Sequence, residues 1–442
     1  MLPGRQGISV SKLISLLTKD INVDDPLSVP EYGKLGGFDA LKKAVTMQRE
    51  DIIGEVKKAK LLGRGGAAYP AGKKWEQLFR IPETPKYIVC NADEGEPGTF
   101  KDAFIMNKLP LRLLEGIIIA GFVFSAKAGY IYVRGEYRKI QKSLIKAIDN
   151  LHTAGFLGKN ILGTGFDFNI HVISGAGAYV CGENSALLNS TEGKVGRPRI
   201  KPPHLAEVGL FLKPTLVNNV ESFANIPFIV GMGGDAFLQA GHIVYSAKVR
   251  TDRGSPPDGG GTKLVCLSGH CRNRGVFEVP LGSISLREII FDSEIGGGLV
   301  NGKKLKFFHL GGQSGPIGCV DQLDTIYGYS DLKKAGLSAG SGAIVIMDES
   351  VSILDYLKKV TEFFIHESCG KCIPCREGNR QLLSFLRKLS VPGGASAQDL
   401  DAMRRLIRTM TDASFCGLGQ TSAAALKSAW KLFKEEFESN VK

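Results

Sequence analysis

The stretch Gly63 to Trp75 constrains this chain most, because it reads Gly-Arg-Gly-Gly-Ala-Ala-Tyr-Pro-Ala-Gly-Lys-Lys-Trp and excludes a regular helix or strand. Four glycines and one proline in thirteen residues leave a bare backbone that can approach a ligand closely. Arg64, Lys73 and Lys74 add positive charge, and a helical pattern begins at Lys74. A bare backbone beside the N–H groups of a helix start suits a phosphate. The loop predicts a phosphate cradle, and an exposed loop with solvated lysines is the alternative.

A polar turn follows the first buried strand of the chain. Lys86 to Cys90 is typical of such a strand, and the turn after it carries Asn91, Asp93, Glu94 and Glu96. The carboxyl ends of strands are where α/β sheets bind ligands. These side chains can accept hydrogen bonds from a polyol or a ring N–H. A calcium site and a solvated acidic turn are the alternatives.

The pattern of strand, glycine turn and helix then recurs. Asp167 to Ile173 is typical of a strand, and a glycine-rich turn follows it from Ser174 to Glu183. The recurrence predicts one α/β domain with a mostly parallel sheet over residues 1–240, including an N-terminal helical extension. We expect one glycine turn to hold a flavin phosphate and the other a second nucleotide. Asn218 and Asn219 add further side-chain donors and acceptors.

A chain of 442 residues is too long for one core and suggests about three domains. Short apolar strands over residues 241–333 predict a small α+β domain. Residues 334–442 predict a four-helix bundle, because apolar residues recur there at intervals of three and four. The expected helices are Val351 to His366, Gly378 to Leu389, Ala397 to Met410 and Gln420 to Glu436.

Composition bears on location and partners. The net charge of +12 comes from basic residues spread along the whole chain, which argues against a nucleic-acid partner. The longest apolar run, Gly116 to Val133, contains Lys127 and three glycines, so we expect no membrane span. Met1 to Asp25 lacks the features of a secretory signal. Nine cysteines, an odd number, fit a reducing cytoplasm, and we expect a soluble protein there.

Four cysteines have the spacing of iron–sulfur ligands. Cys369, Cys372 and Cys375 stand at two-residue intervals just before a helix, and Cys416 stands just before another. Three close thiolates with a distant fourth are the ligand set of a [4Fe–4S] cluster, and helix N-termini stabilise the negative sulfurs. A zinc ion with four thiolates is the chief alternative, and unliganded buried cysteines are another. A cluster implies one-electron transfer.

These motifs, taken in order, resemble the flavoprotein (NADH-binding) subunit of respiratory complex I. The same module occurs as the diaphorase subunit of NAD(P)-linked hydrogenases, formate dehydrogenases and bifurcating transhydrogenases. The resemblance extends from about residue 34 to residue 436. It rests on Gly63-Arg-Gly-Gly-Ala, Lys74-Trp75, the turn 91–98, Gly175 to Glu183, Lys201-Pro-Pro, Asn218-Asn-Val-Glu and the cysteine stretch 367–378.

The resemblance implies a Rossmann-like FMN and nucleotide domain, a β-grasp-like (soluble-ligand-binding, SLBB) domain and a helical bundle with one [4Fe–4S] cluster. The implied FMN contacts are Gly63, Arg64, Gly65, Lys74, Asn91, Asp93, Glu94, Gly182, Glu183, Asn218 and Asn219, and Tyr179 is a further implied cofactor contact. The implied nicotinamide-nucleotide contacts are Gly66, Tyr69, Glu96, Lys201 and, at the two departures below, Asn184 and His204. The implied cluster ligands are Cys369, Cys372, Cys375 and Cys416.

The implied activity is that of an NAD(P)H dehydrogenase subunit of diaphorase type. Hydride passes between nicotinamide and FMN, and single electrons pass between FMN and the cluster. No protein acid or base is needed, and Glu96 is expected to position the nicotinamide. The implied partners are a small thioredoxin-like [2Fe–2S] subunit, a cluster-bearing catalytic subunit and ferredoxin.

Two departures from the family pattern concern the nucleotide. Asn184 stands where a second glutamate is usual, and His204 stands where an aromatic ring supports the adenine. A glutamate at position 184 would repel the 2′-phosphate of NADP. Because asparagine stands there instead, NAD(H) and NADP(H) both stay open as substrates. A soluble hydrogenase, formate dehydrogenase or bifurcating transhydrogenase is the expected parent complex. Respiratory complex I, where the chain would be peripheral to a membrane complex, and an electron-relay subunit with an altered nucleotide site are the alternatives.

Overall fold

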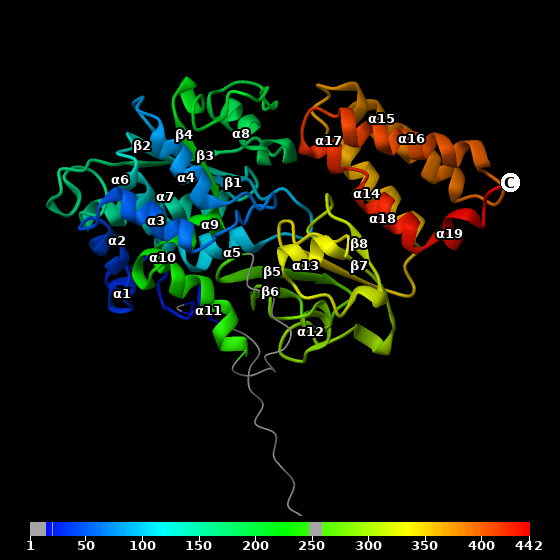
Figure 1. Cartoon of the computed structure of the whole chain (residues 1–442), viewed down its shortest axis with the longest axis horizontal. Helices are drawn as coiled ribbons and strands as arrows, with labels where there is room; N and C mark the ends of the chain where they lie inside the picture. The colour runs from blue at the N-terminus through cyan, green and yellow to red at the C-terminus, as the bar shows by residue number, and fades with distance from the viewer. Residues whose placement is uncertain (1–14, 20, 247–258) are drawn as a thin grey trace, which may run out of the picture.

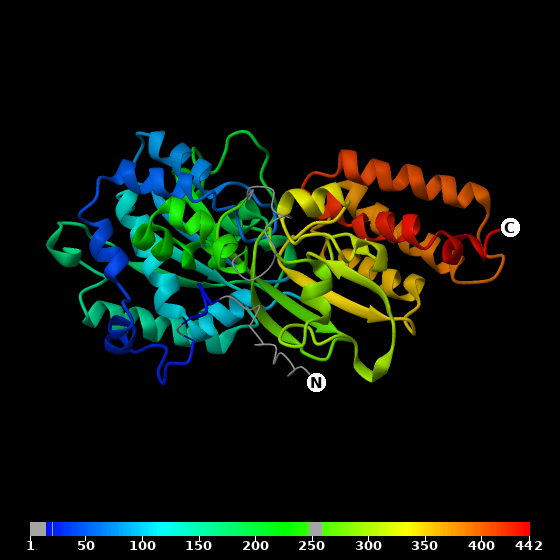
Figure 2. The same ribbon diagram turned by 60° about the horizontal axis from the view of Figure 1, so that its bottom comes forward.

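The computed structural model describes residues 15–19, 21–246 and 259–442, which form three neighbouring lobes (Figures 1 and 2). In Figure 1 a large sheet domain lies on the left, a smaller sheet domain at the lower right, and a helical lobe at the upper right. Most of the stretch Met1 to Asp25, which carried the prediction about a secretory signal, lies outside the described residues.

The first domain is built on a four-stranded parallel sheet with strand order β3-β2-β1-β4. The strands are β1 (Tyr87–Ala92), β2 (Ala128–Val133), β3 (Ile170–Ser174) and β4 (Thr215–Asn219). Asn91 pairs with Asn219 across β1 and β4, so the acidic turn after β1 and the end of β4 at Asn219 lie at the same edge of the sheet. The predicted α/β class with a mostly parallel sheet is confirmed.

Helices cover both faces of this sheet, and α6 (Pro110–Val123) is buried along its whole length. Gly116 lets α6 cross α9 (Val220–Ala224) closely, since a Cβ there would lie 2.0 Å from the carbonyl oxygen of Phe223. Among the described residues, three short helices precede the glycine loop, in the stretch where the sequence predicts a helical extension. Besides α6, the α-helices described in the first domain are α1 (Val29–Lys34), α2 (Asp39–Ala44), α3 (Arg49–Lys58), α4 (Ala71–Arg80), α5 (Lys101–Lys108), α7 (Arg138–Thr153), α8 (Asn184–Thr191), α9 (Val220–Ala224), α10 (Ile226–Met232) and α11 (Gly234–Ser246).

The second domain is a mixed five-stranded sheet with order β6-β5-β9-β7-β8 and two short helices. Its elements are β5 (Thr262–Gly269), β6 (Gly275–Pro280), α12 (Leu286–Phe291), β7 (Leu305–Leu310), β8 (Ile317–Gly318), α13 (Tyr329–Lys334) and β9 (Ala343–Asp348). β9 is the central strand and pairs parallel with β5 and antiparallel with β7. The sheet therefore extends past residue 333, where the sequence had suggested that the helical domain begins.

The third lobe is helical, and apolar faces pack into one core that includes Phe364, Leu382, Met403 and Ala425. Its helices are α14 (Ile353–Glu367), α15 (Ile373–Leu389), α16 (Ala397–Ala413), α17 (Gly417–Thr421), α18 (Ala424–Leu432) and α19 (Lys434–Glu438). The fourth predicted helix, Gln420 to Glu436, is thus divided into pieces. None of the helices in the described residues is long and apolar enough to cross a membrane.

Candidate functional site

A cavity of about 370 Å³ opens at the carboxyl edge of the first sheet, where all three lobes meet. The first domain contributes the glycine loop, the acidic turn after β1 and the turn Tyr179–Gly182. The second contributes backbone and hydroxyl groups of the segments 311–315 and 338–341. The third contributes Gly417, Leu418 and Thr421 from α17. Of the residues singled out in the sequence, those lining the cavity are Gly65, Gly66, Asn91, Asp93, Glu94, Glu96, Tyr179, Gly182, Glu183 and Asn219.

The glycine loop presents bare backbone to this cavity. A Cβ at Gly65 would lie 3.2 Å from the Cβ of Asn219, and Gly66 has a φ of +122°, which side chains rarely adopt. Helix α4 begins at Ala71, three residues before the helix expected at Lys74, with Pro70 as its N-cap. The loop therefore ends sooner than predicted, and Lys74 projects from the first turns of the helix.

The Arg64 side chain does not face the cavity, contrary to expectation. It is fully buried and donates hydrogen bonds to the carbonyl oxygens of Gly260 at 2.7 Å and Thr262 at 3.0 Å. A third bond reaches the Tyr329 hydroxyl at 3.2 Å. These partners belong to the second domain and the strand that opens it, so the guanidinium joins two domains, and only the backbone at this position lies on the loop near a ligand.

Lys74 and Lys201 place two positive charges near each other at the edge of the site. Lys74 donates to the Val217 carbonyl at 3.0 Å, and its ammonium lies 6.0 Å from the ring centre of Tyr69. Burial and the neighbouring Lys201 lower the pKa of Lys74 to about 8. Lys201 pairs with Glu183 at 2.7 Å. A bound anion would relieve the repulsion between the two cations, which fits a phosphate.

Asp93 is half-buried at the cavity, and one of its carboxylate oxygens lacks a partner within the described part of the chain. Its Oδ2 atom is shielded from solvent and receives no hydrogen bond from the described residues. Burial raises the pKa of Asp93 to about 7, although Arg134 acts in the opposite direction. An unpaired buried acceptor is costly unless a ligand supplies a donor. A ring N–H or a sugar hydroxyl would satisfy it, so the residue fits FMN.

Glu94 and Glu96 are held by the protein itself. Glu94 accepts from the backbone N–H groups of Asp102 at 2.7 Å and Ala103 at 2.9 Å, so it caps α5. Burial raises the pKa of Glu94 to about 7. Glu96 accepts from the Tyr179 hydroxyl at 2.5 Å and from the Ser314 N–H at 3.0 Å. Glu96 thereby connects the first domain to the second, at a wall of the cavity.

Several of the other residues lie at the rim or behind the cavity wall. Asn184 accepts from Asn91 at 3.0 Å, which places it next to the wall without lining it. Tyr69 is 41% exposed, and His204 is exposed on the loop after Lys201. Glu183 caps α8 through the N–H groups of residues 185 and 186. The positions among the predicted set that do not line the cavity are Gly63, Arg64, Tyr69, Lys74, Asn184, Lys201, His204 and Asn218.

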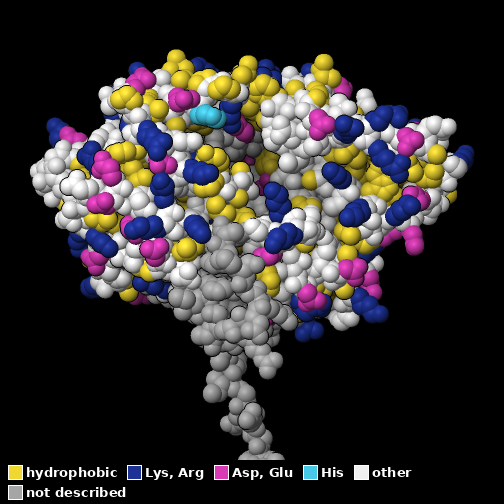
Figure 3. All heavy atoms as spheres, viewed as in Figure 1, with side chains coloured by type: hydrophobic (Ala, Val, Ile, Leu, Met, Phe, Trp, Pro, Cys, Tyr) yellow, Lys and Arg dark blue, Asp and Glu magenta, His cyan; other side chains and the backbone are white. Residues whose placement is uncertain are grey.

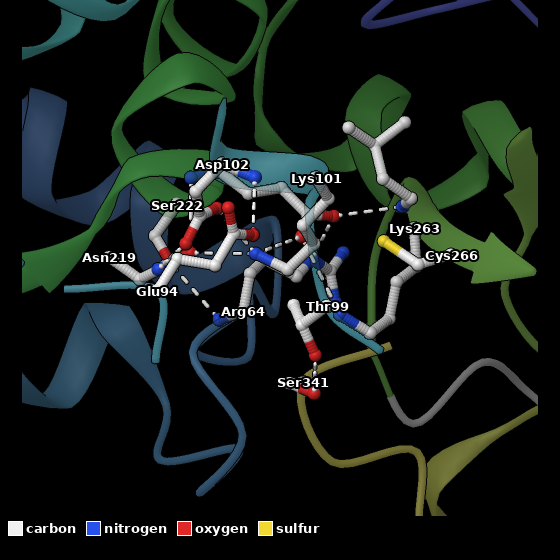
Figure 4. A network of polar contacts seen from close by, with 12 residues as sticks. Arg64, Glu94, Thr99, Lys101, Asp102, Asn219, Ser222, Lys263, Cys266 and Ser341 are labelled. Carbon is white, nitrogen blue, oxygen red and sulfur yellow. Dashed lines mark hydrogen bonds and ion pairs between the residues drawn. The ribbon is translucent and has the colours of Figure 1, made fainter. Parts of the chain in front are cut away.

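A cluster of buried charges beside the cavity was not predicted from the sequence (Figure 4). Glu221 lies among Lys101 at 3.0 Å, Lys263 at 3.5 Å and Arg64 at 3.9 Å. Burial would raise the pKa of Glu221, but these cations lower it to about 2. Lys101 also pairs with Asp102 at 2.6 Å, and both line the cavity. Only an unusual density of charged residues next to apolar ones could have suggested this cluster.

The four predicted cysteine ligands surround a second cavity. Cys372 is the N-cap of α15, and Cys416 is the N-cap of α17. Cys375 lies inside the first turn of α15, which begins at Ile373 rather than near Gly378, so it does not precede the helix as expected. Nowhere in the described ranges do three His, Cys, Asp or Glu side chains converge on one metal ion. Three close thiols and a distant fourth, gathered around one cavity, have the ligand pattern of a [4Fe–4S] cluster.

The two cavities share part of their walls. Val180 and Leu418 line both the cavity at the sheet edge and the cavity among the cysteines. Lys371, between two of the cysteines, donates to the Pro198 carbonyl at 2.7 Å and lies 3.9 Å from the ring centre of Phe415. An apolar partition of two side chains thus separates a site that fits a flavin from a site that fits an iron–sulfur cluster.

Two family models match this chain, one over the region of the first cavity and one over the region of the cysteines. Residues 56–228 match the family described as the Nuo51 FMN-binding domain. Residues 355–440 match the family described as the NADH-ubiquinone oxidoreductase-F iron-sulfur binding region. The first range contains the glycine loop, the acidic turn and the parallel sheet, and the second contains all four cysteines.

Similar proteins occur in two kinds of complex. The chain is 41% identical to the F subunit, numbered 2, of the NADH-quinone oxidoreductase of Rhizobium meliloti over 96% of this chain and 97% of that protein. It is also 41% identical to the NADP-reducing hydrogenase subunit HndC of Solidesulfovibrio fructosivorans, over 97% of this chain and 84% of that one. The crystal structure of an NAD⁺-reducing [NiFe]-hydrogenase in the H₂-reduced state matches with a TM-score of 0.80 at 29% identity. That match covers 92% of this chain and 65% of the hydrogenase chain.

Proposed function

We propose that this chain, which belongs to the family of NADH-quinone oxidoreductase F subunits, is the NAD(P)H-linked flavoprotein subunit of an electron-transfer complex. It is an oxidoreductase subunit with FMN and one [4Fe–4S] cluster as its cofactors. The observation that carries the proposal is that Val180 and Leu418 form a wall shared by the two cavities. Two cofactors on either side of so thin an apolar wall are placed for electron transfer.

We propose that the cavity at the sheet edge holds FMN. Gly65 and Gly66 would offer bare backbone, Asp93 an unpaired acceptor, and Asn219 a polar side chain from the neighbouring strand. Lys74 and Lys201 would draw the phosphate toward their end of the site. Bound FMN supplies the conversion between two-electron transfer with a nicotinamide and one-electron transfer with a cluster. The protein's own residues bind and orient, and Glu96, anchored by Tyr179 and Ser314, would position the nicotinamide.

We propose that Cys369, Cys372, Cys375 and Cys416 hold the cluster. The start of α15 and the start of α17 both face these thiols, and their N–H groups favour the negative charge of thiolates. Phe415 N–H lies 3.5 Å from the Cys372 sulfur, which is a hydrogen bond of the kind that tunes a cluster. The bound cluster supplies single-electron transfer.

The domain division and the partners remain proposals. Because β9 belongs to the second sheet, we place the second boundary after Asp348 and keep the first near residue 240. Similar proteins are subunits of quinone oxidoreductases and of hydrogenases, so we expect this chain to work with other subunits. The proposed partners are a thioredoxin-like [2Fe–2S] subunit, a cluster-bearing catalytic subunit and ferredoxin. We also propose that the complex works in the cytoplasm. A soluble complex and respiratory complex I both fit.

The test uses anaerobic protein loaded with FMN and cluster. NADH or NADPH should bleach the flavin absorbance, and the reduced protein should pass electrons to ferricyanide. Full flavin content without bleaching by either nucleotide would contradict the proposal and would indicate a relay subunit with an altered nucleotide site.

We propose that Asn184 helps to decide between the two nucleotides. In Asn184→Glu the added carboxylate would repel a 2′-phosphate, so kcat/KM for NADPH relative to NADH should fall at least about tenfold, or about 1.4 kcal/mol. Asn184→Gln keeps the amide and is the matched control. An unchanged ratio in Asn184→Glu would mean that this position does not face the 2′ position of the nucleotide.

A further inference from the structure

A larger cavity lies away from both cofactor sites, on the helical lobe. It is a groove of about 610 Å³ between α16 on one side and α18 with α19 on the other. Over these helices, on the right of Figure 3, Lys and Arg side chains border a hydrophobic patch. The lining residues are Arg404, Ile407, Arg408, Thr411, Asp412, Lys427, Trp430, Lys431, Lys434 and Glu438.

The floor of the groove is apolar and fixed in place. Ile407 is 7% exposed and Trp430 is 8% exposed. The Arg404 guanidinium lies 4.8 Å from the Trp430 ring centre, and Phe437 stacks on the same ring with centres 5.9 Å apart. These two contacts hold the ring in place, so the floor is a preformed surface for an apolar side chain.

The walls of the groove carry an excess of positive charge. Five lysines and arginines line the groove with two carboxylates, Asp412 and Glu438, and Arg404 has a further partner outside the lining in Asp401 at 2.8 Å. The two lining carboxylates pair loosely with Arg408 at 3.5 Å and Lys434 at 3.7 Å. Lys427 and Lys431 are both exposed, and the ion pairs found among the described residues include neither of them. The groove therefore attracts anions.

The cations stand in two rows rather than around one point. Arg404 and Arg408 are four residues apart on α16, and Lys427 and Lys431 are four apart on α18. This spacing separates the charges of each row by about 6 Å along the helix axis. A single small anion cannot meet both ends of such rows. Carboxylates repeated along a peptide segment can.

We infer that this groove docks an acidic amphipathic segment of a partner subunit, with carboxylates against the two rows and an apolar side chain on Trp430. The groove begins beside Asp412, four residues before the cluster ligand Cys416, so the docked partner would lie near the cluster end of the lobe. Nucleic acid fits less well, because Arg404 and Phe437 already pack over the Trp430 ring on which a base would have to stack, whereas an apolar side chain needs only contact with the groove floor. A flat membrane surface cannot fill a concave groove. The inference does not depend on the flavin chemistry.

The probe is a synthetic fluorescein-labelled helical peptide with glutamates four residues apart on two adjacent stripes and leucines between them. It should bind the cofactor-loaded full chain and protect α16 and α18 from hydrogen exchange. Lys427→Glu/Lys431→Glu should weaken the peptide's binding at least about tenfold, because each reversal replaces attraction by repulsion.

Lys142→Glu/Lys146→Glu is the matched control, since these lysines are also exposed and four residues apart, on α7 of the first domain. It should bind the peptide as the unmodified chain does, and both double variants should keep ferricyanide reduction. Equal binding by both double variants, or no binding by the unmodified chain, would overturn the inference. Tighter binding of a single-stranded oligonucleotide or of phosphatidylserine vesicles than of the peptide would also overturn it. If NADH and NADPH failed to bleach the flavin while the peptide still bound, that result would contradict the proposed function but not the docking inference.

Discussion

Carboxylates around the flavin site differ in whether the protein or a ligand supplies their hydrogen-bond donors. Glu94 and Glu96 both accept hydrogen bonds from neighbouring elements. Asp93, two residues after Asn91, has an oxygen with no donor among the described residues. Among these three carboxylates, Asp93 is therefore the one that depends most on a bound group.

Asp93→Asn should stabilise the cofactor-free protein and weaken FMN binding. Burial raises the folded-state pKa of Asp93 from 3.8 to about 7, so the wild type loses stability as pH rises through that range. The amide removes this cost, and the variant's advantage in the free energy of unfolding should grow by roughly 1 to 2 kcal/mol between about pH 5 and about pH 8. Urea unfolding at the two pH values measures it. Asp149→Asn on the exposed side of α7 is the control, and an equal pH effect there would contradict the prediction.

At the scale of elements, glycines set how closely helices approach. Gly116 lies where α6 crosses the backbone of α9, and α9 directly follows Asn219 at the cavity. Gly54, in the middle of α3, has no atom from outside its own helix within 4 Å of where a Cβ would lie. The same residue type is therefore a packing requirement in one helix and only an entropic cost in the other.

Gly116→Ala and Gly54→Ala should change stability in opposite directions. The added methyl in α6 would meet the Phe223 carbonyl oxygen, which cannot move without moving α9, so we expect a loss of at least about 1 to 3 kcal/mol. The methyl in α3 meets nothing and should add roughly 0.5 to 1 kcal/mol. Thermal and urea unfolding report both values. A stable Gly116→Ala variant with unchanged FMN affinity would show that the helix crossing tolerates the methyl.

At the scale of the whole molecule, polar contacts hold the lobes around the cavities. Glu221 of the first domain faces Lys263 of the second, and Arg64 bonds carbonyls of the same strand region. Glu436 of the helical lobe pairs with Lys306 of the second domain at 2.9 Å. The first junction is fully buried, whereas the Glu436 side chain is 40% exposed.

Glu221→Gln should therefore cost far more than Glu436→Gln. Lys101 would keep its pair with Asp102, but removing the buried carboxylate leaves the charges of Lys263 and Arg64 without a counterion, a loss of roughly 3 to 5 kcal/mol. Opening the exposed pair should cost less than about 1 kcal/mol. Denaturant unfolding of the two variants tests the contrast, and similar losses would refute it.

The pKa of Glu221, about 2 in the folded chain, adds a pH signature to the same variant. A lowered pKa means that the stabilisation is fully present above the ordinary glutamate pKa of 4.5 and is lost as pH falls from there toward about 2. The wild type should therefore lose its advantage over Glu221→Gln across that acid range. A difference between the two proteins that does not change with pH would contradict the charge argument.

The sequence by itself determined the features that depend on local spacing. Glycines in the loop at Gly63, the strand ahead of Asn91 and the four cysteines each act through a few neighbouring residues, so the fold class and the cofactors could be predicted. Only the tertiary structure decided where long side chains point and which distant segments meet. Arg64 turns to the second domain because carbonyls of residues 260 and 262 lie there, and β9 joins a sheet whose other strands lie far back in the sequence. The shared wall of Val180 and Leu418, and the groove on the helical lobe, arise from packing between residues distant in the sequence, which local spacing cannot encode.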